Sequence, residues 1–87
     1  FSYNAAGQID HLVSPVIDLT TGVTSPILSF SVAYAQYSTT LFDGLRIEVS
    51  SDCGSTFLPS TYFKQGSQLS TAGILTNTFT PSTAGHW

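Results

Sequence analysis

Apolar and polar residues alternate along much of this chain with the period of two that is typical of β-strands. The clearest run covers residues 45–51, where Leu45, Ile47 and Val49 share one face and polar side chains occupy the other. A longer run covers residues 27–37, and we expect its larger apolar positions to face a core. These positions are Leu28, Phe30, Val32 and Tyr34. No stretch shows the period of an amphipathic helix.

Shorter segments complete the predicted set of strands. Residues 9–14 and 16–19 form two pieces separated by Pro15, which favours a sheet edge or a bulge at that point. Residues 61–64 form another strand, and residues 65–84, rich in Gly, Ser, Thr and Asn, are expected to be a long loop or a set of short edge strands. This pattern predicts an all-β fold, an antiparallel two-sheet sandwich.

The length allows one domain at most, and we expect residues 1–87 to form a single module. The chain begins on Phe1 without a methionine and stops on Trp87, an aromatic residue typical of a strand interior. We therefore expect an incomplete segment of a longer module, truncated at both ends.

Charged residues make up only 8% of the chain, and Lys and Arg together number 2. A net charge of −3 without a basic stripe argues against nucleic acid and anionic membrane surfaces as partners. No apolar run is long enough for membrane insertion. Few lysines and many hydroxyl residues favour a secreted or cell-surface protein. The single cysteine, Cys53, excludes an internal disulfide.

The sharpest local pattern is the sequence SSDCGSTF, which follows the clearest strand. Asp52 can accept hydrogen bonds from backbone N–H groups of the following turn, and Gly54 allows a positive φ. The hydroxyls of Ser50 and Thr56 could bond across the turn, and Phe57 supplies an apolar anchor. Each residue type has a structural role, so the pattern predicts a rigid hairpin rather than a catalytic site.

This stretch resembles an Asp-box, Ser-x-Asp-x-Gly-x-Thr-aromatic, which forms surface hairpins in sialidase propellers and other secreted β-proteins. The wider order GQIDHLVSPVIDL, SPILSFSVAYAQY and DGLRIEVSSDCGSTF resembles the jelly-roll modules of secreted Bacteroidetes proteins, related to cleaved-adhesin and MAM-like domains. The match covers residues 6–57, and residues 65–87 fit the variable loop that precedes a further strand. The resemblance implies a non-catalytic, jelly-roll-like sandwich, exported by the type IX pathway.

Several related modules bind calcium as a structural ion, and carboxylate and amide oxygens are suitable ligands for it. Asp10 and Asp43 stand where the family pattern carries aspartate, and Asn4 or Gln8 could add an amide oxygen. The alternative is that each aspartate bonds local backbone at the start of a strand. Asp18, before a Thr-Thr-Gly sequence, is expected to be a turn residue.

Candidate chemistry elsewhere is sparse. His11 and His86 are far apart in sequence without a ligand at metal spacing, and Cys53 has no base nearby to activate it. We therefore expect no enzyme activity. Tyr37 and Phe42 flank a Ser-Thr-Thr loop and are the aromatic residues we expect to be exposed and available to a ligand.

Two functions remain open at this point. One is a non-catalytic adhesion or substrate-binding module that recognises a glycan or a protein at the cell surface. The other is a structural spacer beside a catalytic domain of the same polypeptide, such as a secreted metallopeptidase. Joint exposure of Tyr37, Phe42 and Tyr62 would favour binding, and dispersed or buried rings would favour the spacer.

Overall fold

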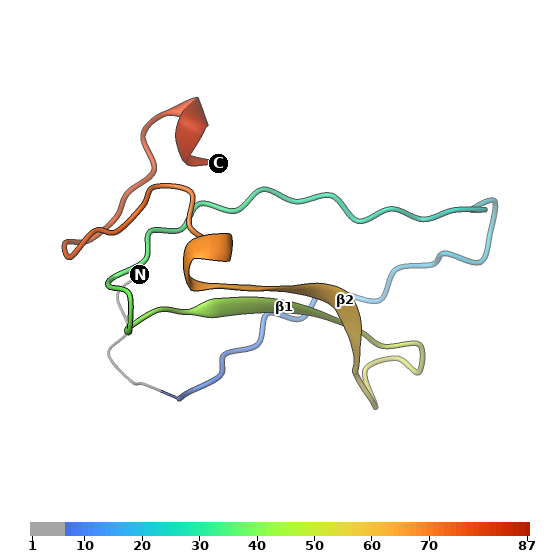
Figure 1. The fold of residues 1–87 in the computed structure, drawn as a ribbon. Coiled ribbons are helices and arrows are strands. Elements are labelled where there is room, and N and C mark those ends of the chain that lie inside the picture. Colours follow the sequence, from blue (N-terminus) through green and yellow to red (C-terminus); the bar gives the residue numbers. More distant parts are fainter. Residues whose placement is uncertain (1–6) are drawn as a thin grey trace. The chain divides into compact units, whose positions relative to one another are not determined.

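A computed structural model describes residues 7–87 of the chain (Figure 1). The chain divides into two units, Phe1–Phe30 and Ser31–Trp87. The second unit carries every regular element of the described residues, so the fold is built from it. Its elements are the strands β1 (Gly44–Val49) and β2 (Leu58–Gln65) and the short 3-10 helices η1 (Gly66–Gln68) and η2 (Ala84–His86).

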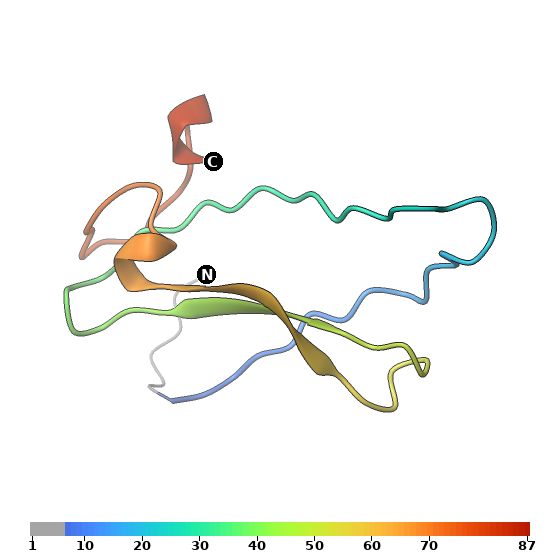
Figure 2. The ribbon, with the colours of Figure 1, turned by 45° about the vertical axis from the view of Figure 1, so that its right-hand side comes forward.

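Strands β1 and β2 pair as an antiparallel two-stranded sheet (Figure 1). Leu45 lies opposite Lys64 and Arg46 opposite Phe63, but the register shifts between Arg46 and Glu48, which pairs with Pro59. Three residues of β2 therefore oppose Ile47 alone, so β2 bulges there, next to a proline that has no N–H to donate. Figure 2 shows β2 twisting strongly along its length, as a bulged strand does.

The two predicted faces of β1 are found only in part. Arg46 and Glu48 share a face and form a salt bridge of 2.9 Å, as alternation requires. Leu45 and Ile47 are half-buried, but Val49 is 58% exposed. A two-stranded sheet buries little by itself, and the described residues place no second sheet over this apolar face.

The strand predicted over residues 27–37 is wrong in extent, because pairing occurs only near its end. Gln36 forms an isolated parallel bridge with Ile74, and its N–H donates to the Gly73 carbonyl at 3.0 Å. The Gln36 carbonyl accepts from the Leu75 N–H at 2.9 Å. Alternation predicts an extended backbone, but a strand also requires a partner. The partner found here, Ile74, comes from residues 65–84, which were expected to be a long loop or a set of short edge strands.

Within the first unit, residues 7–30 contain no regular element, so the strands predicted over residues 9–14 and 16–19 are absent. The predicted turn is present: Gly22 has a φ of 72°. Asp18 Oδ1 accepts the Thr20 N–H at 2.8 Å, and the Thr21 hydroxyl bonds Oδ2 of the same carboxylate. This is the turn role expected of Asp18, and the Thr20 hydroxyl bond lowers the pKa of its carboxyl.

Burial is confined to a small part of the second unit. Leu69 is 7% exposed and Gln36 is 5% exposed, and both lie where η1 meets the bridge between residues 36 and 74. The four positions expected to face a core are not fully buried. Leu28 and Phe30 are exposed, and Val32 and Tyr34 are half-buried. Since residues 7–87 contain no α-helix and two paired strands, the chain belongs to the all-β class.

Candidate functional site

The Asp-box hairpin is the connection between β1 and β2, residues 50–57. The Ser50 hydroxyl donates to Asp52 Oδ1 at 2.7 Å and accepts the Gly54 N–H at 2.8 Å. The Thr56 N–H donates to Asp52 Oδ1 at 2.8 Å, and the Thr56 hydroxyl donates to Asp52 Oδ2. Both carboxylate oxygens are therefore engaged by the hairpin itself, in the turn role expected from the sequence.

These bonds set the ionisation of Asp52. The hydrogen bond from the Thr56 hydroxyl, followed by that from the Thr56 backbone N–H, lowers the pKa of the Asp52 carboxyl to about 2. A carboxylate with this pKa holds no proton near neutral pH and accepts one only in strong acid. General acid–base catalysis needs a pKa near the working pH, so Asp52 is unsuited to it.

The tip of the Asp-box hairpin has an unusual backbone. Cys53 and Gly54 have φ values of 57° and 86°, and the Ser55 N–H donates to the Asp52 carbonyl at 3.3 Å. Two successive positive φ values with this bond define a type I′ turn. The sequence predicted the positive φ at Gly54 but not at Cys53, because cysteine has no preference for the left-handed region.

The residues predicted to hold calcium fall in different parts of the chain. Asp10 is in the first unit, Asp43 is in the second, and Asn4 lies outside the described residues. The Asp43 backbone is well anchored, since its N–H donates to Tyr34 Oη at 2.7 Å and its carbonyl accepts the Gly66 N–H at 3.0 Å. Over residues 7–87, no three His, Cys, Asp or Glu side chains are grouped to hold a metal.

The two histidines belong to different units of the chain. His11 is exposed in the first unit. His86 Nδ1 accepts the Ser82 N–H at 3.1 Å, and its ring meets Phe79 edge-on with centroids 5.4 Å apart. These contacts are structural for η2 and leave Nδ1 occupied.

The predicted ligand-contacting aromatic residues are both exposed, Tyr37 by 53% and Phe42 by 44%. Tyr62 is half-buried, with the Lys64 ammonium 5.6 Å from its ring centroid. The joint exposure of three rings that would favour binding is therefore not found, since Tyr62 is half-buried. Phe42 has a defined setting, because a Cβ built on Gly66 would lie 3.3 Å from its Cγ and 3.4 and 3.6 Å from its two Cδ atoms. Such near-equal distances place the face of the ring against Gly66.

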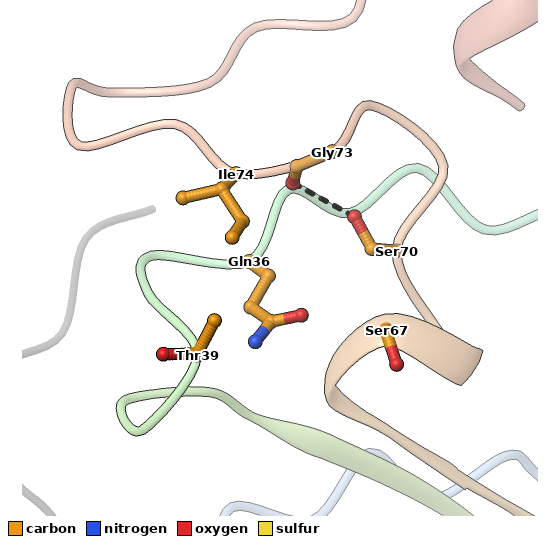
Figure 3. Close-up of a pocket in the computed structure, with 6 residues that line it drawn as sticks. All are labelled: Gln36, Thr39, Ser67, Ser70, Gly73 and Ile74. Carbon is orange, nitrogen blue, oxygen red and sulfur yellow. Dashed lines mark hydrogen bonds between the residues drawn. The ribbon is translucent and has the colours of Figure 1, made fainter.

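A hollow beside Phe42 was not predicted from the sequence. It has a volume of about 430 Å³ and is lined by Gln36, Thr39, Ser67, Ser70, Gly73 and Ile74 (Figure 3). A second hollow of about 280 Å³ shares Gln36, Thr39 and Ser67 and adds Phe42 and Gly66 among its lining residues. Because they share three residues, we treat them as one site, the Gln36 hollow.

Hydrogen bonds made by residues 36–38 and 70–75 hold the Gln36 hollow together. Gln36 is fixed by its backbone bonds to Gly73 and Leu75, and its Nε2 donates to the Ser38 carbonyl. The Ser70 hydroxyl donates to the Gly73 carbonyl at 2.8 Å (Figure 3). Residues more than thirty positions apart thus meet around a nearly buried amide, which no local sequence pattern could reveal.

The lining of the Gln36 hollow carries amides, hydroxyls and apolar groups but no ionisable side chain. It therefore offers neither a proton donor or acceptor with a useful pKa nor a charge to bind phosphate or carboxylate. Its chemistry suits a neutral ligand that both donates and accepts hydrogen bonds.

A scan against protein-family models, a search of curated proteins and a search of solved structures each found no match. No helix within residues 7–87 is long and apolar enough to cross a membrane.

Proposed function

We propose that this chain is a non-catalytic binding module that recognises a glycan or a protein ligand. The observation that carries the proposal is the Gln36 hollow, in which a nearly buried amide and several hydroxyls lie next to the exposed Phe42 ring. A concave site that combines an exposed aromatic ring with a few fixed polar groups is typical of ligand binding.

The side chains at the two candidate sites support a binding role without catalysis. Asp52 is committed to the Asp-box hairpin, and the Gln36 hollow has no carboxylate, imidazole or thiol in its lining. Binding without turnover requires none of these groups.

The resemblance to secreted jelly-roll modules supports a wider setting for this function. In that setting the chain belongs to a two-sheet sandwich of a secreted or cell-surface bacterial protein, exported by the type IX pathway. The Asp-box hairpin then serves as a rigid connection, which agrees with its internally satisfied hydrogen bonds. Calcium held by Asp10, Asp43 and Asn4 remains part of this proposal as a structural ion.

Retention on immobilised ligands tests the binding function. The chain is passed over immobilised neutral polysaccharides and immobilised extracellular matrix proteins, and each ligand is sized before and after incubation. We expect retention on at least one ligand class with the ligand size unchanged. Cleavage of a ligand would show an enzyme, and failure of retention on every ligand would refute the binding function.

A structural spacer is the second candidate, and the first unit favours it. Apolar side chains of this unit are exposed, and apolar surface of this extent is normally covered by another element or a partner. They include Ile9, Leu12, Val13, Val16, Ile17, Leu19, Ile27 and Leu28. Amide hydrogen exchange over residues 9–29, measured with and without the neighbouring domain, tests this role. Protection that appears only with the neighbour would support the spacer, and equal exchange would contradict it.

A further inference from the structure

The Gln36 amide has hydrogen-bonding capacity that the protein does not use. Its backbone N–H and carbonyl are paired with Gly73 and Leu75, and its Nε2 is paired with Ser38. Its Oε1 has no bond to the other lining residues in Figure 3. In Figure 3 this oxygen points toward the side of the hollow that Ser67 and Ser70 line. A fixed acceptor thus faces a site where a ligand could donate to it.

Two hydroxyls complement this acceptor. Thr39 and Ser67 line both parts of the Gln36 hollow, and both residues are exposed. Each hydroxyl can donate one hydrogen bond and accept others. These groups are uncharged, as are the Ser70 hydroxyl and the amides of Gln65 and Gln68, which also line the hollow.

The Phe42 ring supplies an apolar surface next to these polar groups. One face of the ring lies against Gly66, which fixes it, while the side chain stays 44% exposed. Gly66 has a φ of 52°, and any larger residue would push the ring away. A held aromatic face beside uncharged hydrogen-bonding groups matches a ligand with an apolar face and a hydroxyl-bearing rim.

We propose that the Gln36 hollow binds a neutral sugar residue of a glycan, which stacks its C–H face on Phe42 and donates a hydroxyl to Gln36 Oε1. This names the ligand class of the proposed binding function and rests on it. A pyranose ring carries apolar C–H groups on its face and hydroxyls around its edge, so it satisfies both halves of the site at once. The part of the hollow without Phe42 has a volume of about 430 Å³, within the range of small-molecule sites, and the part that Phe42 lines has about 280 Å³, just below that range.

Acidic sugars and peptides fit this site less well. An anionic ligand would lose its hydration without meeting a cation, because no Lys, Arg or His lines the hollow. A peptide strand would need a row of free backbone N–H and C=O groups along an edge. At the Gln36 hollow the backbone N–H and C=O of Gln36 are already paired with Gly73 and Leu75.

Chemical-shift perturbation of the 15N-labelled full chain tests the ligand class. The probes are neutral hexasaccharides of glucose, mannose and N-acetylglucosamine, an oligogalacturonate as the acidic probe, and a neutral extended peptide. We expect at least one neutral hexasaccharide to shift the backbone amides around the hollow and the Gln36 side-chain Nε2 signals. The oligogalacturonate and the peptide should leave these signals in place.

Matched variants assign the contacts. Phe42→Leu should weaken binding by about ten-fold, because the stacking surface is lost, while Phe63→Leu, at an exposed aromatic residue outside the hollow, should not change it. Thr39→Val should weaken binding by about three- to ten-fold, the worth of one neutral hydrogen bond. Thr40→Val is its control, since Thr40 is exposed and absent from the lining.

The outcomes separate the two proposals. Perturbation by the peptide or oligogalacturonate, with none from the neutral sugars, would overturn the sugar assignment and leave a binding module. Sugar-induced shifts located away from the hollow, or equal losses in Phe42→Leu and Phe63→Leu, would overturn the site. The absence of shifts from every probe at millimolar concentration would overturn the sugar site, and the binding function too if the immobilised ligands also fail to retain the chain.

Discussion

Substitution of Gly66 by alanine tests the geometry on which the Gln36 hollow depends. Gly66 has a φ of 52°, and alanine in the left-handed region costs about 1–2 kcal/mol. The new Cβ would also lie 3.3 Å from Phe42 Cγ, closer than ordinary van der Waals contact. The ring must then shift by a few tenths of an ångström, and a side chain displaced by about 30° from its rotamer costs about 0.5–1.5 kcal/mol. The two terms together predict that Gly66→Ala lowers the free energy of unfolding by about 1.5–3.5 kcal/mol.

Gly73 provides a matched control in the same unit. Its φ is 73°, but a Cβ built there meets nothing within 4 Å. Gly73→Ala should therefore show only the left-handed penalty of about 1–2 kcal/mol. The difference between the two variants isolates the contact with Phe42.

Urea unfolding followed by circular dichroism supplies the assay, with free energies from linear extrapolation. In a Phe42→Ala background the excess penalty of Gly66→Ala should disappear, because the ring that it displaces is gone. Equal losses for Gly66→Ala and Gly73→Ala in the wild-type background would refute the packing of Phe42 on Gly66. The Phe42 ring would then not be held by Gly66, and the stacking surface proposed for the Gln36 hollow would lose its support.

Three further predictions concern the Asp-box hairpin and the metal. In the folded chain the pKa of the Asp52 carboxyl is lowered to about 2, below its unfolded value of about 3.9. The Asp52 carboxylate therefore stabilises the folded chain above pH 5, and this contribution is lost as the pH falls from about 4 to 2. A carboxyl 13C titration with a midpoint near 4 would contradict this. Cys53→Asn should raise the free energy of unfolding by up to about 1 kcal/mol, because Asn followed by Gly54 suits the two positive φ values of a type I′ turn. Thermal melts measure this change, and a fall in the melting midpoint would count against that turn. Calcium should raise the melting midpoint of the chain relative to a sample with chelator, and Asp10→Ala or Asp43→Ala should abolish this rise. Identical melts with calcium and with chelator would remove the ion from the proposal.

The Asp-box hairpin was the part of the structure most accessible from sequence. Its bonds join Asp52 to residues no more than four positions away, so residue types and spacing suffice to describe them. The same holds for the Asp18 turn. The positive φ of Cys53 escaped prediction because it is imposed by the neighbouring bonds and not by the preference of cysteine.

The paired strands were located by alternation, although their bounds and the β2 bulge were not. Alternation marks which residues suit an extended backbone, and Leu45 and Ile47 are half-buried as expected. It carries no information on partners, so residues 9–14 and 16–19 looked like strands although no neighbour pairs with them in the structure. Val49 remained exposed for the same reason, since burial depends on what lies over a face.

The Gln36 hollow was decided by tertiary structure alone. Its walls come from residues 36–42 and 65–74, and its bridge joins Gln36 to Ile74 across a long connection. Such contacts depend on closing a loop and on a bond made far along the chain, which local residue preferences do not encode. The sequence by itself determined a low-charge, β-type chain with a rigid hairpin, because those properties follow from composition and neighbouring residues. Only the folded chain determined that a nearly buried amide, two hydroxyls and the Phe42 ring would share one site.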